Sequence, residues 1–421
     1  MNPLKFFLLE RLSRYAHRRG IDIYIEDFSF KKGLSLKNTD IDACGERMLI
    51  ENLRLKIRIK ELFRKRIAID MTSENITVMP GYLSNKDFHL PDLKGNISYE
   101  KRRKSTSIDV TLNQAIHLSL KHTGNADEGE LFVKTSLLSI DRYKQLFDGH
   151  IISRFMNTIY SDTLITFLCC YKYDHTSPYP KFNSTFQYDT LKIHPENCAL
   201  SKMYLTDELS KRNHLAKNYK KLEEIPEIIR QTVICTEDPS FNLHRGISPT
   251  LTGMTLKSAI DQKALKRGGS TISMQLIKNA LLNGERTFTR KTEEAILTLL
   301  MENHYGTGKQ DILEIYLNMI EFAPDIYGIE DAALFYFDKS SSKLNAIEVI
   351  VLTYIIPRPI HFYEALQQKT EQLRRNLLQH IRQYLPVMMK KQIIHRENVS
   401  SADIKQIEFS DKFGVLVLDI L

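Results

Sequence analysis

Four polar clusters between Thr236 and Asn318 carry the residue types that a transfer reaction on a phosphate-linked donor needs. In chain order they are Glu237-Asp238-Pro-Ser-Phe241-Asn-Leu-His244-Arg-Gly246, Gly268-Gly269-Ser270-Thr271-Ile-Ser-Met-Gln275-Leu-Ile-Lys278-Asn, Arg290-Lys291-Thr-Glu-Glu294 and Ile312-Leu-Glu314-Ile-Tyr316-Leu-Asn318. Two separated carboxylates, with a glycine-led helix bearing a cation between them, suit proton abstraction at one end and a bound phosphate at the other. The pattern predicts an enzyme in which Glu237 and Glu294 face a common groove.

Glu237 is the candidate general base. It follows an apolar helical stretch, Ile229 to Cys235, and precedes Phe241. A carboxylate beside apolar side chains loses hydration, which raises its pKa toward the range of a working base. A Glu-Asp pair by itself more often caps or pairs at a helix end. His244 and Gly246 at fixed spacing favour the catalytic interpretation.

The run from Arg267 to Thr271 leads directly into a helical pattern that ends at Lys278. A glycine turn that opens a helix, with a hydroxyl at its cap, offers backbone N–H groups and the positive end of the helix dipole to an anion. Ser270, Met274 and Lys278 recur at four-residue intervals and share a face. This spacing predicts pyrophosphate binding, without the Gly-Lys-Ser/Thr ending of a nucleotide P-loop.

Arg290 and Lys291 lie four and three residues before Glu294, so all three side chains point to one side of a helix. One interpretation is an exposed salt-bridge ladder, worth about a few tenths of a kcal/mol. The other is a cation pair, joined by Arg286, that holds a diphosphate leaving group while Glu294 lies near a divalent ion or the developing charge.

Taken together, the four clusters resemble the peptidoglycan glycosyltransferases (family 51) that polymerise lipid II, over residues 225–359. The resemblance implies a lysozyme-like, mostly helical fold. It implies a reaction that joins the disaccharides of lipid II into glycan strands with inversion and releases undecaprenyl diphosphate. The implied partners are lipid II, the nascent glycan strand, the membrane surface and other cell-wall synthesis proteins, with no nucleic acid. The implied location is the extracytoplasmic (periplasmic) face of the bacterial inner membrane.

Carried over residue by residue, the resemblance implies that Glu237 deprotonates the 4-hydroxyl of the acceptor sugar. Glu294 would be the second essential glutamate, which assists the diphosphate side and binds a divalent metal ion, Mg or Mn. The cations that would hold the diphosphates are Lys278, Arg286, Arg290 and Lys291. The residues that would shape the substrate site around them are Asp238, Phe241, His244, Gly268, Gly269, Ser270, Thr271 and Gln275. The segment 247–266 falls where the family has a mobile, membrane-facing stretch.

Three positions depart from the family pattern. Met274 stands where glutamine is frequent, Phe322-Ala323-Pro324 replaces Phe-Gly-x-Gly, and Phe337-Asp338-Lys339 replaces Phe-Gly-Lys. None removes a proton acceptor or a phosphate cation, so we expect altered loop geometry and retained activity. The departures leave open an alternative, a catalytically inactive glycolipid-binding scaffold. A glycan-cleaving enzyme is a third hypothesis, although it has no use for the phosphate cations. Without a transpeptidase half, the chain resembles a monofunctional polymerase.

The whole chain has 421 residues, 42% of them hydrophobic, and a net charge of +8, which together predict two or three folded domains and an anionic partner. Five scattered cysteines support neither a disulfide framework nor a zinc site. No apolar run reaches the ~18 residues that span a bilayer. We therefore expect the protein to be soluble as given, or its membrane anchor to be absent from this sequence.

The elements that position the clusters fall into two halves, an α+β organisation. Residues 3–18 predict a basic amphipathic helix, and from Gly20 apolar residues alternate with polar ones, as in an antiparallel sheet. The stretch from Gly20 to Val78 resembles AsmA-type lipid-handling proteins, which implies a membrane-proximal or scaffold domain over residues 1–220. A helical period over 221–365 predicts the glycosyltransferase domain, followed by a helical extension over 366–421.

The region between the two halves has weaker patterns. Residues 142–160 predict a helix, and residues 164–173 and 182–193 predict strands. The basic tract 211–221 predicts a solvated linker face, which is the usual role of a charge run.

Overall fold

The computed structural model describes residues 10–11, 13–18, 20–30, 33–43, 46–62, 65–81, 87–112, 116–123, 128–146, 158–174, 181–186, 191–193, 200–252, 269–282, 284–285, 287–399 and 405–418. The chain divides into two compact units. One comprises residues 1–197, 249–269 and 284–296, and the other comprises residues 198–248, 270–283 and 297–421. The helical unit thus begins near residue 198, whereas the sequence places the boundary at 220.

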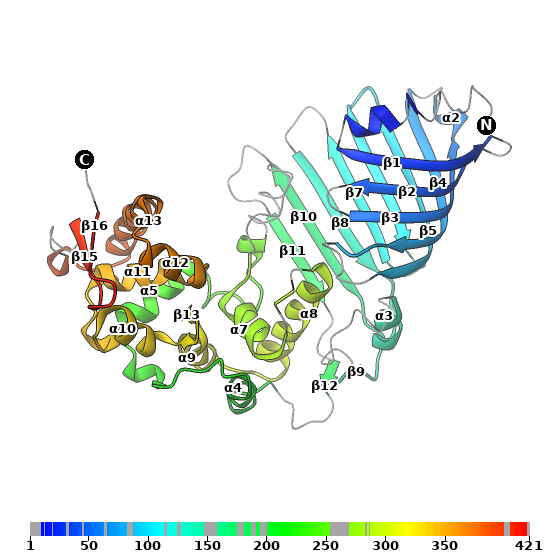
Figure 1. Cartoon of the computed structure of the whole chain (residues 1–421). Coiled ribbons are helices and arrows are strands. Elements are labelled where there is room, and N and C mark those ends of the chain that lie inside the picture. Colours follow the sequence, from blue (N-terminus) through cyan, green and yellow to red (C-terminus); the bar gives the residue numbers. More distant parts are fainter. Residues whose placement is uncertain are drawn as a thin grey trace. The chain divides into compact units, whose positions relative to one another are not determined.

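The first unit is built on one antiparallel sheet of ten strands in the order β1-β2-β3-β4-β5-β6-β7-β8-β10-β11 (Figure 1). The alternation in the sequence predicted this β-rich half, and the structure confirms it. The strands are β1 (Ile21–Ser29), β2 (Leu34–Ala43), β3 (Glu46–Ile57), β4 (Arg66–Val78), β5 (Phe88–Glu100), β6 (Ser105–Leu112), β7 (Ile116–Thr123), β8 (Glu128–Thr135), β10 (Phe167–Asp174) and β11 (Lys181–Phe186).

The strand register places the apolar residues of neighbouring strands on one face of the sheet. Ile57 is opposite Ile69, which is opposite Ile97, which is opposite Ile108. Because side chains alternate along a strand, the polar residues between them lie on the other face. The apolar face is partly open, since Ile57 is 56% exposed and Ile67 is 48% exposed.

The predicted helix over residues 142–160 is wrong at its end. Helix α3 (Ile140–Leu146) occupies its beginning, but Ile159 and Tyr160 belong to β9 (Ile159–Ser161), which pairs with β12 (Leu191–Ile193). Residues 147–157 lie outside the described part. A β-branched and an aromatic residue side by side favour a strand once a partner is present, and that partner lies 32 residues away, at Lys192 opposite Tyr160.

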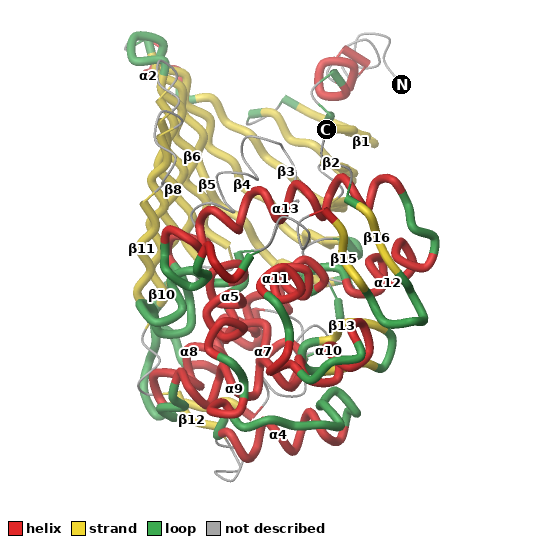
Figure 2. The backbone as a smooth tube through the Cα atoms, turned by 90° about the vertical axis from the view of Figure 1, so that its left-hand side faces the viewer, coloured by secondary structure: helices red, strands yellow, loops and turns green. Residues whose placement is uncertain are grey.

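The second unit is mostly helical, and its helices α5, α11 and α13 pack against one another (Figure 2). Its helices are α4 (Lys202–Lys211), η3 (Leu222–Glu224), α5 (Glu227–Glu237), α7 (Ile272–Leu281), α9 (Lys309–Met319), α10 (Ile329–Phe337), α11 (Ala346–Ile355), α12 (Pro359–Gln367) and α13 (Glu371–Lys390). Two short strand pairs complete it, β13 (Glu321–Ala323) with β14 (Ile326–Tyr327) and β15 (Gln406–Glu408) with β16 (Val415–Val417). Helix α8 (Phe288–Leu299) crosses the division between the units and continues into the π-helical turn η4 (Leu300–His304).

Helix α11 lies in the core of the second unit. It begins at a capping box, in which Asn345 and Glu348 each bind the other's backbone N–H, and nearly all of its residues are buried. Among the described residues, no single helix is long and apolar enough to cross a bilayer. Helices α11 and α12 reach that length and composition only together, and they meet at 116°.

The basic tract 211–221 has exposed charges, as the sequence predicted, but it is not a free linker. Its backbone is held by α9 and α10: the Ala216 N–H donates to the Asn318 carbonyl at 2.8 Å, and the Lys217 N–H donates to Asp331 at 2.6 Å. The Lys220 N–H donates to the Asn318 side chain at 2.9 Å. The lysine charges indicated the solvated face, but they gave no sign that the backbone between them is bound to two helices.

Two aspartates accommodate departures from the family pattern. Asp338 ends α10 in the left-handed conformation with φ 51°, and Asp325, after Pro324, has φ 62°. Glycine is the usual residue there, but aspartate tolerates this region because its short side chain bonds locally. At Asp338, a side-chain oxygen accepts from the Asp411 N–H at 3.4 Å. The turn after α10 therefore forms without glycine.

Candidate active site

Glu237 is the last residue of α5, whose other turns bury Ile229 and Val233 in the core. Its side chain is only partly buried. The Gln275 side-chain amide, on α7, donates from Nε2 to Oε2 of Glu237 at 3.1 Å. The sequence predicted a carboxylate at the end of an apolar helix, and the described geometry has that form.

Asp238 is fully buried and connects three segments. Its carboxylate contacts Nε2 of His244 at 2.9 and 3.1 Å and accepts the Ile272 N–H at 3.2 Å. Ile272 is the first residue of α7, so a carboxylate of the protein already lies at that helix N-terminus, where the dipole favours it. The anion site predicted at this N-terminus is therefore occupied, at least in part, by Asp238.

Thr271 and Gly246 fix the loop beside α7. Thr271 is the N-cap of α7, where its hydroxyl accepts the Met274 N–H at 3.1 Å and donates to the Gly246 carbonyl at 2.5 Å. Gly246 has φ +93°, and a Cβ there would lie 3.0 Å from Cγ2 of Thr298. Only glycine meets both the conformation and the close approach.

Phe241 is buried under a charged pair. The Lys309 ammonium lies 4.3 Å from the centre of the Phe241 ring and 2.8 Å from the Glu302 carboxylate, which also accepts from Ser273. Phe241 thus acts as a packing surface for the loop that follows Asp238. Lys309 and Glu302 stand outside the residues singled out from the sequence, and no spacing rule connects them to Phe241.

The Ile-Leu-Glu-x-Tyr-Leu-Asn cluster on α9 serves two sides of the helix. Glu314 accepts from the Tyr219 hydroxyl at 2.8 Å and from the Leu222 N–H at 3.0 Å, which ties the incoming chain to α9. Tyr316 donates its hydroxyl to Oε1 of Gln275 at 3.1 Å. One cluster therefore anchors the chain and reaches the Glu237 site.

Lys278 lies in the last turn of α7, half-buried, and its charge acts on Glu321. Burial raises the pKa of Glu321, the negative charge of Asp325 raises it further, and Lys278 opposes both. Gly269 and Ser270, just before α7, are also half-buried. Gly268, Arg286 and most of the segment 247–266 lie outside the described residues.

The cation cluster of α8 is compact and largely buried. Arg290 binds Oε2 of Glu294 at 2.5 Å, Lys291 binds Oε1 at 2.5 Å, and Arg290 also donates to the Glu285 carbonyl. The Glu294 side chain is 1% exposed, against 13% for Arg290 and 32% for Lys291. An exposed salt-bridge ladder is therefore the wrong interpretation of this cluster.

A metal ion does not fit Glu294 as the described residues stand. Both carboxylate oxygens accept from cations, and no group of three or more His, Cys, Asp or Glu side chains in the described part could hold a metal. A divalent ion prefers several oxygen ligands that are not already paired. The metal at Glu294 stays a prediction.

Comparison with known proteins agrees with this assembly of residues. Residues 205–382 match the family model described as Transglycosylase. The chain is 36% identical over 176 residues to a biosynthetic peptidoglycan transglycosylase of Nitrosomonas eutropha. The aligned residues make up 42% of this chain and 70% of that relative. The chain belongs to the transglycosylase family.

Two further relatives show how far the likeness extends. A biosynthetic peptidoglycan transglycosylase of Alcanivorax borkumensis is 36% identical over 149 residues, and this chain spans 60% of its length. The penicillin-binding protein 1A/1B of Bacillus subtilis is 34% identical over 163 residues, which are 18% of its length. The transglycosylase match contains all four polar clusters of the sequence.

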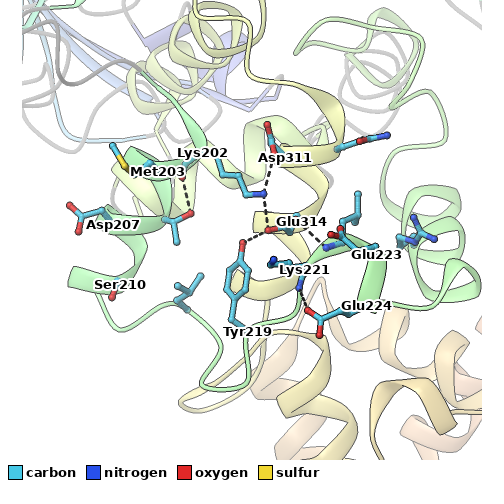
Figure 3. Close-up of a pocket in the computed structure, with 15 residues that line it drawn as sticks. Lys202, Met203, Asp207, Ser210, Tyr219, Lys221, Glu223, Glu224, Asp311 and Glu314 are labelled. Atoms are coloured by element: carbon cyan, nitrogen blue, oxygen red, sulfur yellow. Dashed lines mark hydrogen bonds and ion pairs between the residues drawn. The ribbon is translucent and has the colours of Figure 1, made fainter.

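An open cavity of about 1270 Å³ lies where α4, η3 and α9 of the second unit meet (Figure 3). Its lining includes Lys202, Tyr219 and Glu314 but not Glu237. Lys202 lies 2.8 Å from Glu314 and 3.1 Å from Asp311, so these charges pair with one another across the cavity wall. The cavity belongs to the segment that anchors the chain on α9.

Proposed function

We propose that the transglycosylase half polymerises lipid II, joining its disaccharides into glycan strands with inversion and releasing undecaprenyl diphosphate. The observation that supports this most directly is Glu237, a partly exposed carboxylate at the end of a buried helix, bound by the Gln275 amide. A carboxylate is an acceptor and can take a proton from a bound hydroxyl. In the proposed reaction, Glu237 deprotonates the 4-hydroxyl of the acceptor sugar.

The proposed leaving-group side is the cation cluster. As the bond to the diphosphate breaks, negative charge grows on its oxygens, and fixed cations stabilise that charge. The proposed cations are the side chains of Arg290, Lys291, Lys278 and Arg286. Glu294 would keep Arg290 and Lys291 in place, because it binds both.

We further propose a lysozyme-like fold for the helical half and a site of action at the extracytoplasmic face of the inner membrane. Lipid II and the nascent strand are the proposed substrates, with the membrane surface and other cell-wall synthesis proteins as partners. The ten-stranded sheet would be an AsmA-like membrane-proximal or scaffold unit. Its open apolar face and the net charge of +8 support a location near anionic lipid.

The test is turnover of purified lipid II by the full chain, with glycan products separated on a gel and the Glu237→Gln variant as the matched control. We expect polymer from the wild type and none from the variant. Binding of lipid II without any turnover by the wild type would overturn the proposal in favour of an inactive scaffold. Fragments released from intact sacculi, with no product from lipid II, would replace it with glycan cleavage.

A further inference from the structure

We propose that Tyr316 is a positioning residue for Glu237 and acts through Gln275. Its hydroxyl holds the Gln275 side chain in the one orientation that turns the amide NH₂ toward the Glu237 carboxylate. This inference depends on the proposed role of Glu237 as the base.

The three side chains form a continuous relay from three helices. The Tyr316 hydroxyl of α9 lies 3.1 Å from Oε1 of Gln275 on α7, and Nε2 of Gln275 lies 3.1 Å from Oε2 of Glu237 on α5. An ionised carboxylate only accepts hydrogen bonds, so the amide NH₂ must face Glu237. The amide oxygen then points away from Glu237 and needs a donor, which the tyrosine hydroxyl provides.

Tyr316 is suited to remain that donor. It is completely buried, and burial raises its pKa well above the ordinary value, with the charges of Glu237 and Asp238 raising it further. The hydroxyl therefore keeps its proton whenever Glu237 is ionised. The Gln275 amide has one favourable orientation between its partners, because a reversed amide would place its oxygen against a carboxylate that can only accept.

The relay has two consequences for a general base. A hydrogen bond donated to a carboxylate favours its charged form, which keeps Glu237 ready to accept a proton. The same bond restricts the Glu237 side chain, and a misplacement of about 1 Å at a reacting group costs up to about 100-fold in rate. Without the Tyr316 hydroxyl, the Gln275 amide oxygen loses its donor, and the side chain is free to move its NH₂ group away from the carboxylate.

The first experiment is lipid II turnover by Tyr316→Phe, with Tyr336→Phe as the matched control. Tyr336 is equally buried in the same unit and donates its hydroxyl to the Phe322 carbonyl at 2.8 Å. We expect kcat to fall about 10- to 100-fold in Tyr316→Phe with little change in KM, because the lost hydroxyl affects the position of the base. We expect Tyr336→Phe to keep wild-type turnover. Equal rates in the two variants would overturn the proposal.

A double-mutant cycle separates the relay from a general packing effect. If Tyr316 acts through Gln275, adding Tyr316→Phe to Gln275→Ala should reduce kcat no further, because the relay is already broken. Losses that multiply in Gln275→Ala/Tyr316→Phe would show that Tyr316 acts by another route and would sink the inference.

A third measurement needs no turnover and therefore separates this inference from the proposed function. The ionisation of Glu237 can be followed by the ¹³C shift of its carboxyl carbon in each variant. The Gln275 amide donates to the Glu237 carboxylate, and the charges of Glu237 and Asp238 act on Tyr316. In Tyr316→Phe we expect the pKa of Glu237 to rise, because the Gln275 amide is no longer held against the charged form. An unchanged titration would refute the relay, whereas absent lipid II turnover in the wild type would refute only the proposed function.

Discussion

Glu237 and Glu294 are residues of the same type in two of the four clusters, yet their surroundings are opposite. Glu237 is partly exposed and bound by a neutral amide, whereas Glu294 is 1% exposed and bound by a guanidinium and an ammonium. A carboxylate beside a neutral donor remains an acceptor for a further proton donor, while one bound by two cations holds both of them in place. On the proposed function, the first arrangement suits proton transfer and the second suits the holding of cations.

The largest expected effect is on turnover. Glu237→Gln should reduce lipid II polymerisation by about 1,000-fold, which is within the range for loss of a general base, and should leave thermal stability unchanged. Measured initial rates and the unfolding midpoint check both halves of the prediction. A variant that retains near-normal turnover would break the comparison, because Glu237 would then not be the base.

The second prediction concerns stability, for which we expect the Glu294 substitution to have a larger effect than the Glu237 substitution. Glu294→Ala should lower the free energy of unfolding by about 3 kcal/mol, because Arg290 and Lys291 lose a buried partner. Glu237→Ala should lower it by less than about 1 kcal/mol, because the site is partly exposed. Urea unfolding of the two variants measures the contrast. Similar losses in both would show that the environments differ less than the geometry indicates.

The third prediction sharpens the comparison around Glu237 itself. Asp238→Asn should lower the free energy of unfolding by about 2 kcal/mol. The reason is that a fully buried carboxylate, which binds His244 and the Ile272 N–H, is replaced by a side chain with one acceptor oxygen. Glu237→Gln, at the adjacent residue, should lower the free energy of unfolding by far less. The difference between the two midpoints in urea tests whether stability belongs to Asp238 and chemistry to Glu237. Equal costs would contradict that division.

The smallest effect extends the comparison to a third glutamate. Burial by itself raises the pKa of Glu314, but hydrogen bonds from Lys202, Tyr219 and the Leu222 N–H outweigh it, so the pKa lies below the ordinary value. The resulting stabilisation is fully present above the unfolded pKa and is lost as the pH falls through the folded value. Stability of the wild type should therefore fall more steeply below about pH 4.5 than that of Glu314→Gln. Parallel pH curves would count against this.

Local spacing in the sequence predicted which side chains share a helix face, because that geometry depends only on near neighbours. Helical spacing was enough to bring Arg290, Lys291 and Glu294 to one side of α8. The same reasoning failed where the partner is distant. The charge run 211–221 gave no sign that its backbone binds Asn318, and residues 159–160 gave no sign that a strand at 191–193 would pair with them.

The sequence alone determined which residue types are present and which segments have a helical or an extended period, because residue type and periodicity are local properties. Only the tertiary structure decided that Asp238 occupies the N-terminus of α7, that Glu294 is buried between its cations, and that Tyr316 reaches Glu237 through Gln275. Burial and hydrogen bonding between distant segments set the protonation and orientation of a carboxylate. Those quantities exist only once α5, α7 and α9 are packed together.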